Sequence, residues 1–138
     1  MSKLVRFGMS LEEDLLVQFD RHIQKKKYTN RSEAIRDLIR DDLVKQEWTD
    51  NKDVTGVISL VYDHHMRELV NKILDIQHDD PSCIVSTQHI HLDHHHCFEV
   101  IVTKGKSQNI EGLFQKLKSI KGVKHAGFTK ATSGADLS

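Results

Sequence analysis

Histidine and cysteine, two residue types that bind transition metals well, are concentrated in one stretch of the sequence. The chain has 138 residues and ten histidines, and six of these histidines lie within the nineteen residues that precede Cys97. His89 and His91 are two residues apart in a segment that alternates like a β-strand, so both rings leave the same face. Cys97 begins the next strand-like segment. The spacing predicts a metal site that contains His89, His91 and Cys97.

A hairpin between these two segments would set the geometry of the site. If residues 92–96 form the turn, His91 lies opposite Cys97 and His89 lies opposite Glu99. Glu99 could then accept a hydrogen bond from the second ring nitrogen of His89 and orient it. His78, at the end of the preceding predicted helix, is the best candidate for a fourth ligand, from the same or another subunit. Such a set suits tetrahedral zinc or square-planar nickel or copper, and the alternative is a solvated strand with a polar turn.

The elements that must position these side chains alternate in type along the second half of the chain. Apolar patterning predicts a strand, a helix, two strands, a helix and a final strand at residues 56–62, 65–78, 83–92, 97–104, 110–120 and 123–131. The order βαββαβ predicts an α+β, ferredoxin-like domain with both helices on one face of a four-stranded antiparallel sheet. Cys83 is expected to be a buried small residue.

Near the start of the chain, residues 4–11 alternate between apolar and other side chains. No second strand is predicted for more than forty residues, so another copy of the chain is the expected partner. The outward face carries Arg6, Gly8 and Ser10, and two such strands can lie in a DNA major groove, where arginine donates to guanine. A strand that only dimerises the chain is the alternative. Ser10 is also expected to cap the helix that follows.

A second helix is predicted from Asn30, which with Glu33 three residues later resembles a capping box. Asn30, Arg31 and Ser32 also offer donors suited to a DNA phosphate. Glu33 and Asp37 are four residues apart on this helix, a spacing that could provide a weak oxygen site for a hard cation.

Composition and charge limit the class of protein. Hydrophobic residues are 38% and charged residues 29%, as in soluble proteins, and the net charge of zero gives no support for nucleic-acid binding. No segment has the apolar length of a membrane helix or a signal peptide, so we expect a cytoplasmic protein without membrane contact. The polar residues 46–55 predict a linker with a boundary near Asp50, which gives domains 1–50 and 51–138.

Taken together, RFGMSL (6–11), NRSEAIRD (30–37), His78, HIH (89–91) and Cys97 make the chain resemble the nickel-responsive ribbon-helix-helix repressors over nearly its full length. The resemblance implies a ribbon-helix-helix domain joined to an ACT-type domain. It also implies a homotetramer, built as a dimer of dimers, that holds one Ni²⁺ per subunit across an interface. The implied nickel ligands are His89, His91 and Cys97 of one subunit and His78 of a neighbour.

The resemblance also implies a function, namely nickel-dependent repression through an operator that controls nickel uptake. Arg6, Gly8 and Ser10 match the DNA-reading strand, and Gly8 replaces a hydroxyl residue found in some relatives. Glu33 and Asp37 match a potassium-like site. Some further residues match positions near metal sites or could hold extra ions: Tyr62, His64, His65 and His94 to His96.

Two other classes are consistent with the same residues. One is a metal buffer, or a zinc- or copper-binding regulator, on a ferredoxin-like domain, and the other is an ACT regulator that binds an amino acid. We do not expect an enzyme, because no catalytic pair is evident and four protein ligands leave no open coordination position.

Overall fold

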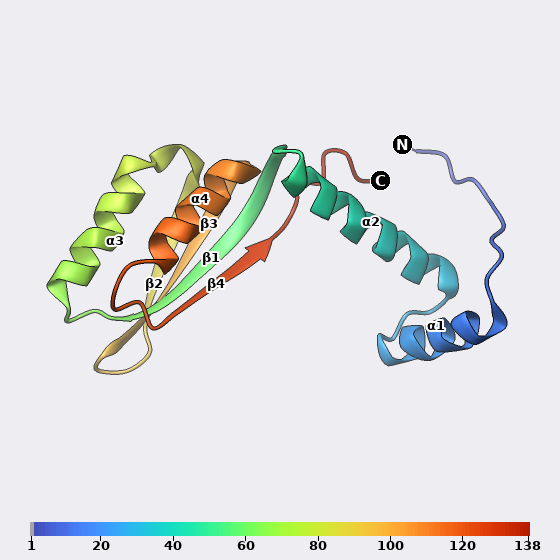
Figure 1. Ribbon diagram of the computed structural model, residues 1–138, viewed down its shortest axis with the longest axis horizontal. Helices are drawn as coiled ribbons and strands as arrows, with labels where there is room; N and C mark the ends of the chain where they lie inside the picture. Colours follow the sequence, from blue (N-terminus) through green and yellow to red (C-terminus); the bar gives the residue numbers. More distant parts are fainter. Residues whose placement is uncertain (1) are drawn as a thin grey trace. The chain divides into compact units, whose positions relative to one another are not determined.

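The structure is a computed structural model that describes residues 2–138. The chain forms two compact units, one comprising the residues up to Leu43 together with Asp136–Ser138, and the other Val44–Ala135 (Figure 1). Within the described part of the chain, no helix combines the length and apolar character needed to cross a membrane.

The first unit contains α1 (Glu13–Lys25) and the beginning of α2 (Arg31–Thr49). The predicted start of α2 is confirmed, because the backbone N–H of Glu33 donates to Oδ1 of Asn30 at 2.9 Å. The predicted cap of α1 is wrong. Glu12, not Ser10, is the N-cap residue and makes no side-chain capping bond, so the acids of the first turn are left to stabilise this helix end.

Residues 2–12 form no helix or strand in the single chain. Their apolar side chains are exposed, Leu4 to 87% and Phe7 to 73%. Next to them, α1 and α2 leave an apolar hollow, lined by residues that include Met9, Leu15 and Leu38. A face of this kind is typical of a surface that contacts another protein. The predicted strand at 4–11 requires a partner strand from another copy, so it stays a prediction.

The second unit contains a four-stranded sheet and two helices. Its elements are β1 (Asp53–Asp63), α3 (Arg67–Asp79), a short 3-10 helix (Pro81–Cys83), β2 (Ile84–His91), β3 (His96–Lys106), α4 (Ser107–Lys118) and β4 (His125–Lys130). The strand order is β2-β3-β1-β4, and every neighbouring pair is antiparallel. Helices α3 and α4 cover the same face of the sheet (Figure 1). This arrangement confirms the predicted ferredoxin-like class.

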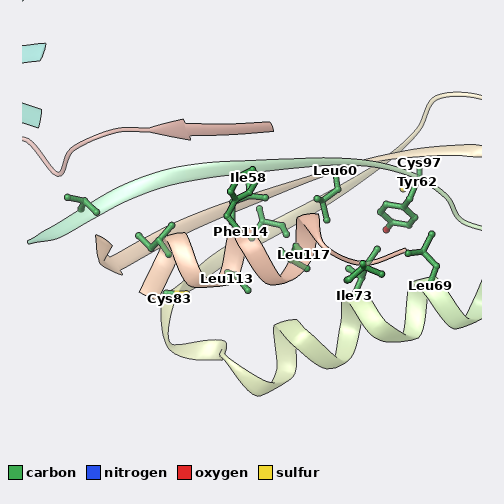
Figure 2. Packing of buried hydrophobic residues seen from close by; sticks show 14 of the residues in the cluster. Ile58, Leu60, Tyr62, Leu69, Ile73, Cys83, Cys97, Leu113, Phe114 and Leu117 are labelled. Carbon is green, nitrogen blue, oxygen red and sulfur yellow. The ribbon is translucent and has the colours of Figure 1, made fainter. Parts of the chain in front are cut away.

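The core lies between this face of the sheet and the two helices (Figure 2). Alternate residues of β1 point into it, among them Ile58 and Leu60, and α4 contributes Leu113 and Leu117. Cys83 is buried, as predicted. Neither helix of the second unit, α3 or α4, lies over the opposite face of the sheet (Figure 1).

The expected linker at residues 46–55 is wrong. Residues 46–49 form the last turn of α2, and residues 53–55 already belong to β1. Trp48 is buried, its indole N–H donates to the carbonyl oxygen of Ala131 at 2.8 Å, and its ring packs edge-on against Phe128. These contacts stabilise the end of α2 as part of the second unit.

Candidate functional site

Strands β2 and β3 form the predicted hairpin. The register places His89 opposite Glu99 and His91 opposite Cys97, which confirms the predicted pairing. On the other side of β3, Tyr62 lies opposite Cys97. Tyr62 and Cys97 are among the side chains that point into the core (Figure 2). The candidate ligands of this hairpin therefore lie at the edge of the helix-covered face.

The thiol and one imidazole are close enough to share a metal ion. Sγ of Cys97 lies 3.8 Å from Nδ1 of His89. Metal–sulfur and metal–nitrogen bonds are about 2.3 Å and about 2.0 Å long, so one ion can contact both atoms at their present separation. Cys97 is buried, whereas the side chain of His89 is 46% exposed. The pair fits a borderline transition metal such as Ni²⁺, Cu²⁺ or Zn²⁺.

Glu99 holds the other side of the His89 ring. Its carboxylate is fully buried and lies 3.3 Å from Nε2 of His89. It also accepts hydrogen bonds from the hydroxyl of Tyr62 and the amide of Gln77, each at 3.0 Å. A buried carboxylate requires such donors. A proton on Nε2, the nitrogen beside Glu99, would leave Nδ1 of His89 as the metal-binding atom, and Nδ1 is the nitrogen that faces Cys97.

Tyr62 remains protonated in this environment. Burial, and then the neighbouring Glu99 carboxylate, raise the pKa of the Tyr62 phenol well above its ordinary value. The hydroxyl is also 3.4 Å from Nδ1 of His89. Tyr62 therefore acts as a neutral hydrogen-bond donor to Glu99, whose carboxylate lies beside the ring of His89.

A second imidazole accompanies His91. The ring of His64 lies 4.6 Å from that of His91, centroid to centroid, and Nδ1 of His64 is buried with no hydrogen-bond partner among the described residues. Loss of surrounding water, and then the nearby His65 and His91, lower the pKa of His64. A neutral imidazole therefore lies directly beside a candidate ligand.

The register places His91 opposite Cys97, but among the described residues the ligand atoms of His89, His91 and Cys97 do not all lie within 4.8 Å of one another. His78 is not brought to this group by its own chain. It lies in the last turn of α3 and is exposed, and no hydrogen bond or ring contact within residues 2–138 joins it to His89, His91 or Cys97. Its neighbour Gln77 is the residue of α3 that contacts the site, through Glu99. Sequence reasoning missed Gln77, and its only signal was its position next to a candidate ligand.

The predicted DNA-binding residues lie in the first unit. Arg6, Gly8 and Ser10 are exposed, as are Asn30, Arg31 and Ser32 at the start of α2. The guanidinium of Arg31 makes two hydrogen bonds to the Asp20 carboxylate, at 2.9 and 2.8 Å. These bonds hold the pKa of Asp20 below its ordinary value. The arginine is thus oriented at the beginning of α2, where backbone N–H groups favour anions.

Each carboxylate of the predicted hard-cation site already has an arginine beside it. Glu33 forms an ion pair with Arg36, and Asp37 lies 3.4 Å from Arg40. Asp37 also accepts a hydrogen bond from the hydroxyl of Tyr28 at 2.9 Å. The chain by itself does not group Glu33 and Asp37 with a third metal-binding side chain among the described residues.

Comparison with known proteins also divides the chain into an N-terminal and a C-terminal part. Residues 5–46 match the family described as "Ribbon-helix-helix protein, copG family", and residues 55–131 match the one described as "NikR C terminal nickel binding domain". Among solved structures, an uncharacterised Thermotoga maritima protein, TM1266, is similar with a TM-score of 0.52 and 15% identity, over 57% of this chain and 98% of that one. This last likeness concerns the fold alone.

Close relatives cover nearly the whole chain. A protein of Syntrophus aciditrophicus is 57% identical over 94% of each chain, and one of Desulfovibrio desulfuricans is 50% identical over 99% of each chain. Another, from Chlorobium phaeobacteroides, is 55% identical over 91% of this chain and 93% of its own. All three carry the name nickel-responsive regulator.

The fold and the site define a ribbon-helix-helix protein with a metal-binding ferredoxin-like domain. The chain belongs to the family of nickel-responsive regulators, whose members are transcriptional regulators and not enzymes.

Proposed function

We propose that the protein is a cytoplasmic, nickel-dependent transcriptional repressor that binds operator DNA when Ni²⁺ is bound and thereby controls nickel uptake. The observation that most supports this is the 3.8 Å separation between Sγ of Cys97 and Nδ1 of His89 in a chain of this family. The relatives named nickel-responsive regulators favour nickel over the zinc and copper that the same donors also suit.

The proposed nickel site is shared between subunits, with one ion per subunit. His89, His91 and Cys97 of one chain would provide three donors, and His78 of a neighbouring chain the fourth. The exposure of His78, and its lack of contact with the other three residues in its own chain, support this sharing. Three nitrogens and a thiolate suit the square-planar geometry of Ni²⁺.

Gln77 and Glu99 provide a route by which the site can act on α3. Gln77 in the last turns of α3 donates to Glu99, which in turn holds His89. If His78, next in sequence to Gln77, also binds the nickel ion of a neighbouring subunit, the end of α3 is fixed at two places, by the Gln77–Glu99 hydrogen bond and by the metal. Metal then favours the DNA-binding arrangement only if that arrangement binds metal more tightly than the others.

Two apolar surfaces support a homotetramer assembled as a dimer of dimers. The first is the exposed segment around Phe7 and Met9, where ribbon strands of two chains would pair. The second is the uncovered face of the sheet, on which Val57 and Val102 are register partners, each more than a third exposed. In this assembly, Arg6, Gly8 and Ser10 would face the DNA bases, and Asn30, Arg31 and Ser32 the phosphates.

Mixing two defective chains tests the shared site. His78→Ala and Cys97→Ala each remove one donor, so neither homogeneous protein should show the charge-transfer absorption of thiolate-bound nickel. After the two proteins are unfolded and refolded together, some sites combine Cys97 of one chain with His78 of the other, and part of the absorption should return. Each variant refolded alone is the control. If the mixture shows no more absorption than the controls, ligand sharing between subunits is wrong.

A further inference from the structure

The residues after β4 return to the first unit. This tail, residues 131–138, begins in the second unit, which extends to Ala135, and its last residues, Asp136–Ser138, belong to the first unit. Helix α2 is the other connection, because it crosses the boundary between Leu43 and Val44 without a break. The chain therefore joins the two units twice.

Hydrogen bonds hold the beginning of the tail in the second unit. The backbone N–H of Ala131 donates to the carbonyl oxygen of Thr55 at 2.9 Å, and its own carbonyl oxygen accepts the indole N–H of the buried Trp48 at 2.8 Å. The hydroxyl of Thr132 donates to the carboxylate of Glu47 at 2.9 Å. The carbonyl oxygen of Thr132 accepts the hydroxyl of Thr55 at 3.1 Å. These bonds fix both Ala131 and Thr132.

Arg40 holds the other end of the tail in the first unit. Its Nε and Nη2 donate to the main-chain oxygen of Ser138, at 3.0 and 2.7 Å. Leu137 is half-buried, whereas residues 133–136 are exposed. Nη1 of Arg40 also lies 3.4 Å from Asp37, and the arginine side chain is 41% exposed. Exposed contacts of this kind are individually weak, so the end of the tail can detach while both units stay folded.

We propose that Arg40 and Ser138 form a clasp that makes the tail a strap between the two units. An extended chain spans at most about 3.6 Å per residue, so the exposed stretch 133–136 gives the held tail little reach. While the clasp is closed, the first unit can move only as far as this stretch allows. Once the clasp is open, α2 alone limits the movement.

The role of the strap in regulation rests on the proposed function, in which nickel in one unit acts on DNA binding by the other. The proposal places the DNA-binding arrangement among those that the held tail permits. Opening the clasp makes further arrangements accessible, so a smaller share of the molecules is competent to bind DNA. The apparent DNA affinity falls in proportion to that share.

The first test measures motion in the full-length protein with a chelator present. Arg40→Ala removes the donors of the clasp, and a chain without residues 136–138 lacks the acceptor. Relaxation of backbone amides in deuterated, nitrogen-15-labelled protein gives the rotational correlation time of each unit. In both variants, the correlation time of the first unit should fall relative to that of the second. Arg36→Ala loses the Glu33 ion pair on the same helix but leaves Arg40 in place, so it should match the wild type.

The second test measures DNA affinity at saturating nickel, on a duplex selected with the wild-type protein. Both variants that open the clasp should bind at least about fivefold more weakly, the lower end of the usual range of coupling between two sites. The shortened chain keeps Arg40, so a loss shared by both variants does not come from a direct contact between this arginine and DNA. Arg36→Ala again serves as the matched control.

The proposal is overturned if both variants keep the wild-type ratio of correlation times, or if this ratio changes and the DNA affinity at saturating nickel does not. A wild-type protein whose DNA affinity does not respond to nickel would instead contradict the proposed function. The relaxation measurement is made without nickel, so the two failures are distinguishable.

Discussion

Cys97 and Cys83 are both buried, but only Cys97 lies beside an imidazole nitrogen. Burial, and then the nearby Asp80, raise the pKa of the Cys83 thiol, which keeps it protonated and a poor ligand. We therefore expect Cys97→Ala to abolish the thiolate-to-nickel absorption band, while Cys83→Ala keeps it. Titration with nickel under an ultraviolet–visible spectrometer measures both. A wild-type spectrum from Cys97→Ala would exclude this cysteine as a ligand.

Glu99 can be tested with a substitution of nearly equal size. Glu99→Gln replaces one oxygen, which accepts hydrogen bonds, with an NH2 group, which donates them. The hydroxyl of Tyr62, the amide of Gln77 and Nε2 of His89 all face this carboxylate, so the new NH2 group would meet them without an acceptor. The mismatch should lower nickel affinity by about 10–100-fold and the free energy of unfolding by about 1–3 kcal/mol. Competition with a chelator and denaturant unfolding report the two effects. Unchanged nickel affinity would show that Glu99 does not orient His89.

The sequence predicted those features of the helices and strands that depend on neighbouring residues. The alternation around His89 and the short polar turn were sufficient to predict the β2–β3 register, because a one-residue slip would turn every side chain to the other face. The end of α2 was not predictable in this way. Trp48 is held by Ala131 and Phe128, which are distant in sequence. The role of Gln77 likewise depends on a tertiary contact, with Glu99.

The N-terminal segment gives a prediction about DNA specificity. In the predicted strand at residues 4–11, Arg6 would lie on the face opposite the apolar side chains, so pairing of two such strands would place two copies of Arg6 in one groove. Arg6→Ala should reduce the free energy of binding to the preferred sequence by about 1–3 kcal/mol per contact, and the free energy of binding to random DNA by much less. Fluorescence anisotropy with the two duplexes, at saturating nickel, measures the difference. Equal losses on both duplexes would show that this strand does not read bases.

Arg31 provides the matched comparison at the start of α2. Its guanidinium is oriented by Asp20. Its proposed contact is a phosphate, which carries no sequence information. Arg31→Ala should weaken binding to specific and random duplexes alike. The slope of the logarithm of the binding constant against the logarithm of the salt concentration should become shallower by about one for each lost phosphate contact. A selective loss at the preferred sequence would instead assign Arg31 a role in base recognition.

The uncovered face of the sheet should determine the oligomeric state. Val102 is 37% exposed and lies opposite Val57 on this face. Val102→Asp would bury a charge in the proposed dimer–dimer interface and should convert tetramers into dimers with unchanged circular dichroism. Light scattering after size-exclusion chromatography measures the mass. Gln115→Asp, at an exposed position of α4, is the control, and tetrameric Val102→Asp would exclude this face.

Coupling between the metal site and the DNA-binding unit can be measured as DNA affinity with and without Ni²⁺. A duplex would first be selected from a random pool with the nickel-loaded wild-type protein. Nickel should then raise the affinity of the wild-type protein for this duplex by about 5- to 150-fold, the usual range of coupling between two sites. Cys97→Ala should show no such increase. Equal wild-type affinity with and without nickel would show that nickel does not control DNA binding, and the same nickel response from Cys97→Ala would show that this site does not mediate it.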